Sequence, residues 1–308
     1  MPRHPRDRPE HMKAGGPLLM VASAATWAAG LVLTKATLDV TGAAPGSVLV
    51  VQLIASVGAL AAACAVTGAS LRGAWRPGWV GLLEPGIAYQ LGLAGLALTS
   101  AANASVLGSL EPVMVPLIAW ALLRERPHWR LVVVIAGATA GSALVSFSAG
   151  GGAGSWAGDG LVVASVVAAA FYVVVASRQV TAIAPLPAAL TQQVWALGFV
   201  IVCQFVLAGP LRLSVTPTQL LLAGAAGILN YALPFWLYLT ALRRMPVARA
   251  AGYLTLIPVF GVLGAVLVLG EQVTWLDLAG GALVVGSLVA DARTAPASDL
   301  VLKREEVR

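Results

Sequence analysis

Two glutamates stand inside stretches of the sequence that are otherwise apolar, and their carboxyl groups could exchange protons. Glu111 precedes Pro112 in the apolar run 102–123, and Glu84 precedes Pro85 in the run 78–98. An ionisable side chain at the centre of a membrane-spanning helix costs about 2.5–3.5 kcal/mol on insertion scales, so both residues are functional candidates. The alternatives are a structural carboxyl at Glu111 and, at Glu84, a side chain that reaches the membrane interface.

Polar and aromatic side chains recur at the spacing that places residues on one face of a helix. Three such faces carry Ser23, Trp27, Gly30 and Thr34; Ser165, Ala169, Tyr172 and Ala176; and Gly227, Tyr231, Pro234 and Tyr238. The candidates for binding a substrate are Trp27, Thr34, Tyr89, Gln90, Tyr172, Asn230, Tyr231 and Tyr238. Aromatic walls with few hydrogen-bonding groups suit a zwitterionic or amphipathic small molecule. Ordinary packing between helices is the alternative for each residue.

A membrane-embedded enzyme would need a nucleophile with its base, a pair of carboxylates or a set of metal ligands at membrane depth. The three histidines, His4, His11 and His128, lie outside the apolar runs or at their boundary, so no deep cluster could hold a metal. Glu84 and Glu111 could pair, but their predicted depths differ. We therefore expect no enzymatic activity and no metal or other cofactor.

The composition identifies the solvent of the protein as lipid. Hydrophobic residues make up 59% of the chain and charged residues only 10%, against about 25% charged residues in soluble domains. The net charge of +6 could suggest nucleic acid as a partner. The basic residues lie between apolar blocks rather than along one patch, so we expect no nucleic-acid binding.

Apolar runs of the length needed to cross a bilayer follow one another along the chain, about 20 residues each. The expected spans are 17–36, 46–67, 78–98, 102–123, 129–148, 158–177, 188–208, 218–241, 247–269 and 274–292. The predicted fold is an all-α integral membrane protein with ten transmembrane helices. All but two of the 19 Lys and Arg residues then fall on one side, the exceptions being Lys35 and Arg212. This bias predicts that both tails, 1–16 and 293–308, are cytoplasmic.

An internal repeat relates the two halves of the sequence. A shift of 146 residues superposes 102–129 on 248–275 without a gap, and the matches include Pro112 with Pro258 and Glu125 with Glu271. The repeat unit is then five helices, 17–148 and 158–292, joined by a Gly-rich external linker at 149–157. An odd number of helices inverts the second copy, so the halves form a 5+5 inverted repeat. That architecture is typical of transporters with a substrate site near the midplane.

Small residues four apart occur in two expected spans, as Gly137-x-x-x-Gly141 and Ala282-x-x-x-Gly286. Such pairs allow two helices to approach closely. We interpret them as packing sites within the chain, with a homodimer interface as the alternative.

The stretch from Thr26 to Lys35, TWAAGLVLTK, resembles the first-helix signature of EamA-type proteins in the drug/metabolite transporter superfamily. The pattern of a proline-containing helix that ends at Glu125, and again at Glu271, is similar to the fourth and ninth helices of that family. The resemblance implies a 5+5 repeat in the plasma (inner) membrane and efflux of small metabolites, and one branch of the family exports amino acids. It also implies a role for Lys35 at the mouth of the cavity, with a side chain that reaches the membrane surface as the alternative.

These observations predict a secondary transporter of small organic metabolites, such as amino acids, that works by alternating access. A channel or a purely structural membrane protein is the alternative, and the inverted repeat argues against it.

Overall fold

Every regular element is helical in the part of the chain that the computed structural model describes, which is residues 15–96, 98–99, 107–124, 129–148, 155–179, 182–211, 216–269 and 274–294. In the first half the elements are α1 (Gly15–Thr41), α2 (Pro45–Thr67), η2 (Pro77–Leu82), η3 (Leu83–Ile87), α3 (Ala88–Leu96), α5 (Glu111–Leu123) and α6 (Trp129–Ser148). In the second half they are α7 (Trp156–Gln179), α8 (Pro185–Cys203), η4 (Gln204–Ala208), α9 (Pro217–Gly227), η5 (Ile228–Ala232), α10 (Leu233–Leu242), α11 (Val247–Leu254), α12 (Leu256–Gly264), η6 (Ala265–Leu269) and α13 (Trp275–Thr294).

Several helices have the length and apolarity of membrane spans. Six described segments qualify: Gly15–Leu38, Pro45–Thr67, Trp156–Gln179, Pro185–Leu207, Pro217–Leu242 and Val247–Val268. Shorter apolar helices cover Glu111–Leu122, Trp129–Leu144 and Trp275–Ala290. Because lipid cannot satisfy exposed backbone groups, a helical chain of this apolarity is the expected product of the sequence. Most of the predicted tail 1–16, most of the linker 149–157, most of the tail 293–308, and Glu125 and Glu271 lie outside the described residues.

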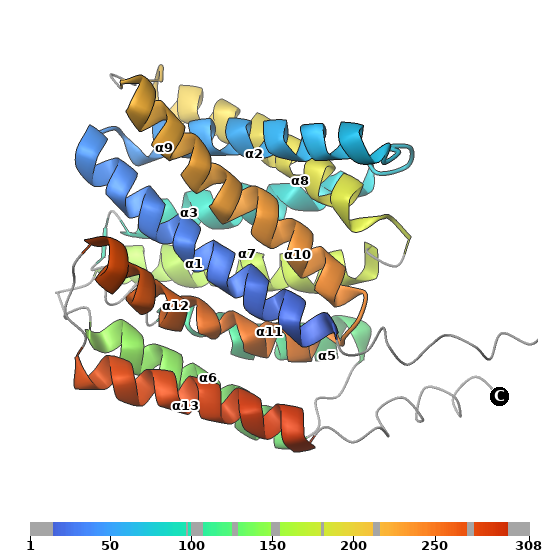
Figure 1. Ribbon diagram of the computed structural model, residues 1–308, viewed down its shortest axis with the longest axis vertical. Helices are drawn as coiled ribbons and strands as arrows, with labels where there is room; N and C mark the ends of the chain where they lie inside the picture. Colours follow the sequence, from blue (N-terminus) through green and yellow to red (C-terminus); the bar gives the residue numbers. More distant parts are fainter. Residues whose placement is uncertain are drawn as a thin grey trace, which may run out of the picture.

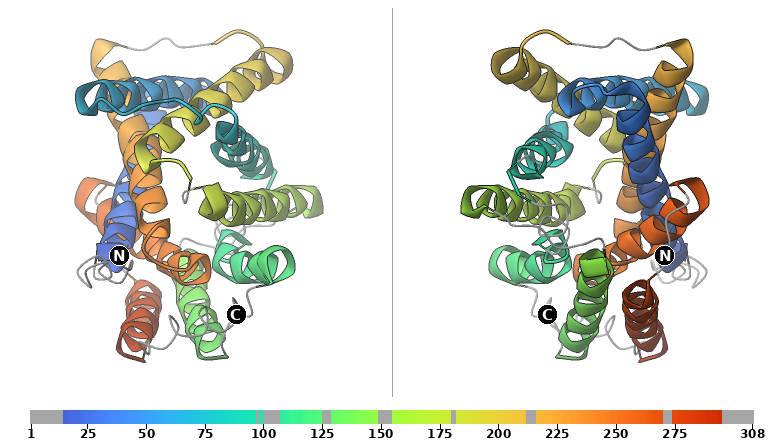
Figure 2. Two further views of the ribbon diagram at one scale, coloured as in Figure 1. Left: turned by 90° about the vertical axis from the view of Figure 1, so that its right-hand side faces the viewer. Right: turned by 90° about the vertical axis from the view of Figure 1, so that its left-hand side faces the viewer.

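Helices from the two halves of the sequence pack against one another (Figures 1 and 2). At one end of the molecule α2 lies against α8, and at the other end α6 lies against α13. Between these pairs, α1 packs on α9 and α10, while α7 packs on α3 and α5. Each half therefore contributes to the same buried core.

Glycine allows the close approach of α6 and α13. A Cβ atom added to Gly141 would lie 2.6 Å from the carbonyl oxygen of Gly280, and one added to Gly137 would lie 2.7 Å from Ser287 Oγ. The first small-residue motif thus packs within the chain. In the second motif, Gly286 has no described atom within 4 Å of an added Cβ, and both Ala282 and Gly286 are exposed.

Two further glycines mark where helices of different halves cross. A Cβ at Gly81 in η2 would overlap the backbone of Gln192 in α8, and a Cβ at Gly227 in α9 would overlap the backbone of Gln52 in α2. Gly81 and Gly227 are separated by 146 residues, the offset of the sequence repeat. A side chain at either position would force the two backbones apart.

The expected span 78–98 is not one regular helix. It consists of the 3₁₀ segment η2, the π-helical segment η3 and the α-helix α3, and within η3 Glu84 has extended backbone angles, with φ −147° and ψ 129°. Proline disfavours the α-helical conformation of the residue before it, so Pro85 explains why the helix breaks at Glu84. The break lies beside the cavity described below.

Candidate functional site

A cavity of about 540 Å³ lies between the two halves. The first half lines it with residues of α1, α2, η3, α3 and α5, and the second half with residues of α7, η5, α11 and α12. Its polar and aromatic lining residues include Trp27, Thr34, Gln52, Glu84, Tyr89, Glu111, Ser165, Asn230 and Tyr231. Ligand pockets in proteins commonly measure about 300–1,000 Å³, so the cavity has room for a small organic molecule.

Along α1 and α7, the cavity-lining residues lie toward one end of the helix, and the described residues toward the other end are buried in the core. On α1, Trp27 and Thr34 line the cavity, whereas Ser23 is fully buried and donates a hydrogen bond of 2.9 Å to the carbonyl oxygen of Pro234. On α7, Ser165 lines the cavity, whereas Tyr172 is buried against α8. On each of these two helices, one part of the polar face lines the cavity and the other part packs in the core.

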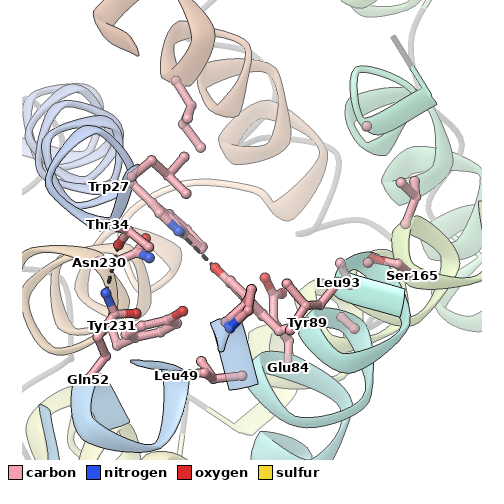
Figure 3. A pocket seen from close by; sticks show the side chains of 18 of the residues that line it. Trp27, Thr34, Leu49, Gln52, Glu84, Tyr89, Leu93, Ser165, Asn230 and Tyr231 are labelled. Carbon is pink, nitrogen blue, oxygen red and sulfur yellow. Dashed lines mark hydrogen bonds between the residues drawn. The ribbon is translucent and has the colours of Figure 1, made fainter. Parts of the chain in front are cut away.

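Aromatic side chains lie where the cavity meets the buried core, and Figure 3 labels Trp27, Tyr89 and Tyr231 among them. Trp27 Nε1 donates a hydrogen bond of 2.9 Å to Tyr89 Oη, which links α1 to α3. The ring of Tyr89 lies edge-on to that of Tyr231, with centroids 5.3 Å apart. On the core side, the ring of Phe235 lies 5.0 Å from Trp27 and 5.7 Å from Tyr172. We call Trp27, Tyr89, Tyr231 and Phe235 the aromatic floor.

The acidic residues meet in this cavity although they are far apart in the sequence. Glu84 is 5% exposed and Glu111 is half-buried, and both line the cavity. The sequence predicted different depths for them, but the break at Glu84 places its carboxyl group on the cavity wall (Figure 3). Among the described residues, no Lys, Arg or His lines the cavity.

Asn230 is a third polar group in the cavity, beside Thr34 (Figure 3). It is 1% exposed, and its Oδ1 atom has no hydrogen-bond partner among the described residues. Its backbone lies so close to α1 that a Cβ at Gly30 would contact it at under 3 Å. Asn230 and Glu84 stand at the offset of 146 residues that relates the two halves.

Gln52 is a lining residue that the sequence prediction did not include. Its Nε2 atom donates a hydrogen bond of 2.8 Å to Thr34 Oγ1, which joins α2 to α1 at the cavity wall (Figure 3). An amide in the apolar run 46–67 is a signal that could have identified it, because polar groups inside a membrane span need partners. Apolar lining residues such as Leu49 and Leu93 carry no comparable signal.

The remaining sequence-predicted candidates do not line the cavity in this structure. Tyr172 and Tyr238 are buried in the core, and Tyr172 Oη donates a hydrogen bond of 2.8 Å to Gln192 Oε1. Gln90 is half-buried on α3, and Lys35 is exposed near the end of α1. Their roles in binding stay predictions.

Comparisons with known proteins agree with a membrane transporter. The model of the EamA-like transporter family matches the chain twice, over residues 14–147 and 156–290. A search of curated proteins gives no match. Among solved structures, one described only as "Crystal structure of protein" is similar, with a TM-score of 0.76 and 22% identity over 94% of this chain and 99% of that chain. At this identity the likeness establishes a shared fold.

Proposed function

Because the chain belongs to the EamA-like transporter family, within the drug/metabolite transporter superfamily, we propose that it is a secondary transporter that moves small organic molecules, amino acids among them, by alternating access. The observation that carries the proposal is the cavity between the two halves, which is lined by residues of both and bordered by the aromatic floor. A substrate site of this kind near the middle of a repeat interface is typical of secondary transporters.

An arrangement of ten transmembrane helices as a 5+5 inverted repeat accounts for the contacts between the halves. Gly81 of the first half meets Gln192 of the second, and Gly227 of the second half meets Gln52 of the first. Each contact therefore has a counterpart in which the two halves have changed places. The two glutamines stand 140 residues apart, as do Pro45 and Pro185 at the starts of α2 and α8. The packing of α1 on α9 and α10 likewise has a counterpart in that of α7 on η2 and α3. These paired contacts support a pseudo-twofold relation.

The orientation suggested by the basic residues makes this an outward-facing state in the plasma (inner) membrane. With both termini cytoplasmic, the C-terminal end of α1 and the N-terminal end of α7 face outward, and these are the ends that line the cavity. The aromatic floor then separates the cavity from the cytoplasm. In the inward-facing state the contacts below the floor, such as that of Ser23 with Pro234, would open. Export is the proposed direction.

Glu84 and Glu111 are the proposed coupling groups. A carboxylate buried without a counter-charge is costly, and binding a proton removes that cost. No described basic residue lines the cavity to neutralise these carboxyl groups. We therefore propose that each is neutralised by a proton that enters through the cavity. A proton exchanged on either residue would link transport to the proton gradient.

Counterflow in proteoliposomes tests the function. Vesicles that contain the purified chain and an unlabelled amino acid mixture should accumulate a labelled amino acid transiently, whereas empty vesicles should not. Trp27→Ala removes part of the aromatic floor and should reduce counterflow, with Trp156→Ala, whose side chain is exposed, as the matched control. Uptake that does not respond to the trapped solute would favour the alternative of a channel, and no flux for any solute would refute transport.

A further inference from the structure

We propose that the cavity recognises its substrate by a protonated primary amine, so that the substrates are amphipathic amines, with zwitterions as weaker ligands and simple carboxylates excluded. This inference rests on the proposed transport function and names the chemical class that the site would take. The observation behind it is the combination of two carboxyl groups, an unpartnered amide oxygen, aromatic walls and no basic side chain among the described residues of one cavity.

The described side chains of the cavity can carry charge of one sign only, the negative one. Glu84 and Glu111 are the charged side chains among its described lining residues. Two carboxyl groups facing one low-dielectric space repel each other when ionised, and both are stabilised by a cation between them. A ligand carboxylate would meet the same repulsion without any lysine or arginine on the described wall to offset it. The electrostatics therefore favour a cationic group and oppose an anionic one.

Asn230 supplies an independent indication of a hydrogen-bond donor on the ligand. Its Oδ1 atom is buried and has no partner among the described residues, although a buried carbonyl oxygen without a donor is unfavourable. The side chain lines the cavity together with Thr34 and Tyr231 (Figure 3). A primary ammonium carries three N–H donors, which matches a site whose polar groups, Glu84, Glu111 and Asn230, can all accept hydrogen bonds.

The aromatic walls account for the apolar part of the substrate. Trp27, Tyr89 and Tyr231 line the cavity beside apolar side chains such as Leu31, Leu49 and Ile257. Aromatic faces also attract cations, so the walls and the carboxyl groups favour the same ligand. An amine with an aromatic or aliphatic tail satisfies both.

Three probes with one phenyl skeleton test the inference on the purified full-length chain: 2-phenylethylamine, which carries only an ammonium group, phenylalanine, which carries both groups, and 3-phenylpropionate, which carries only a carboxylate. Binding is measured as the rise in melting temperature with probe concentration, because a ligand of the native state stabilises it. We expect the amine to bind at least about tenfold more tightly than 3-phenylpropionate, with phenylalanine between them.

Charge-removing variants connect the preference to named residues. Glu84→Gln and Glu111→Gln should each weaken amine binding by about tenfold or more and leave the weak binding of 3-phenylpropionate unchanged or stronger. Asp277→Asn is the matched control, because Asp277 caps α13 through Thr274, away from the cavity lining, and should bind the amine like the wild type. If a glutamine variant does not fold, acidification of the wild type replaces it, since protonated carboxyl groups should lose the amine.

Several results would overturn the amine preference. These are 3-phenylpropionate binding as tightly as the amine, no probe binding at all, or both glutamine variants keeping wild-type affinity for the amine. The proposed transport function fails on a different result, the absence of counterflow for every solute. A chain that transports carboxylates would therefore remain a transporter and lose only the amine preference.

Discussion

Adding one methyl group at the two glycine crossings should destabilise the protein by a similar amount at each. A Cβ at Gly81 would overlap the backbone of Gln192, and one at Gly227 the backbone of Gln52. Neither obstacle is the end of a flexible side chain, so the helices must separate. Overpacking of this kind costs about 1–3 kcal/mol, and the higher helix propensity of alanine returns at most about 1 kcal/mol. Because the overlaps are with backbone, we take the upper overpacking cost of about 3 kcal/mol. After the gain in helix propensity, the free energy of unfolding should fall by about 2 kcal/mol.

Gly58→Ala is the matched control for both substitutions. Gly58 lies in α2, and no described atom is within 4 Å of an added Cβ, so only the propensity gain applies. With an unfolding entropy of about 2.1 cal/mol/K per residue, 1 kcal/mol shifts the melting temperature of a chain of this length by about 1.5 °C. In thermal unfolding of detergent-purified protein at one scan rate, Gly81→Ala and Gly227→Ala should therefore melt about 3 °C below the wild type. Gly58→Ala should melt at or above it.

The comparison with Gly58→Ala decides the outcome. If Gly81→Ala and Gly227→Ala also melt at or above the wild-type temperature, the helices do not cross at these glycines. The support that the exchanged contacts give to the inverted repeat then disappears. If only one of the two is destabilised, the crossings are not equivalent and the pseudo-twofold relation does not extend to them.

Three other predictions test the orientation, the floor and the coupling. Reporter fusions should read as external after residues 42, 153 and 212 and as cytoplasmic after residues 75, 126 and 244; a cytoplasmic signal at 153 contradicts the five-plus-five scheme. Tyr89→Phe removes the acceptor of the Trp27 hydrogen bond and should destabilise the proposed outward-facing state by about 1 kcal/mol. The measurement is the apparent affinity for substrate added from the external side, which should be weaker; an unchanged affinity would mean that the bond does not stabilise the aromatic floor. Glu111→Gln should preserve folding and abolish substrate accumulation driven by a pH difference, while exchange without a gradient persists at saturating substrate; accumulation in this variant would remove Glu111 from coupling.

Several polar and aromatic residues of the cavity could be predicted from the sequence because they stand in stretches that are otherwise aliphatic. In a chain with 59% hydrophobic residues, Trp27, Asn230 and Glu111 are conspicuous at membrane depth, and all three line the cavity. A polar group inside a membrane span is costly unless it has a use or a partner, so residue type alone carries information. Gln52 obeys the same rule and could have been predicted.

Helical spacing predicted faces but not depths. Tyr231 and Tyr238 share a helical face, yet Tyr231 lines the cavity and Tyr238 is buried in the core. Seven residues along a helix correspond to a rise of about 10 Å, which spans the boundary at the aromatic floor. The depth at which two helices separate depends on how they pack together. The helical periodicity of one segment gives no information about that depth.

Local breaks in the helices were also beyond the periodicity argument. The kink at Glu84 in η3 and the π-helical turn η5 interrupt the regular helical register, and they lie in the segments that contribute Glu84 and Asn230. Pro85 predicts a break in the helix at Glu84. The direction in which the carboxyl group then points depends on the neighbouring helices. The common wall shared by Glu84 and Glu111 is therefore a result of tertiary packing.

The repeat supplies the scaffold of this site, and departures from the repeat supply its chemistry. Positions 84 and 230 are related by the offset of 146 residues and both line the cavity, but one carries a carboxyl group and the other an amide. Tyr89 and Phe235 are related by the same offset, and both contact Trp27: the tyrosine accepts its hydrogen bond, and the phenylalanine packs against its ring. Two related backbones thus hold one tryptophan from both halves. Because only one partner has a hydroxyl group, the tryptophan N–H donates its hydrogen bond to Tyr89, in the half that also carries Glu84 and Glu111.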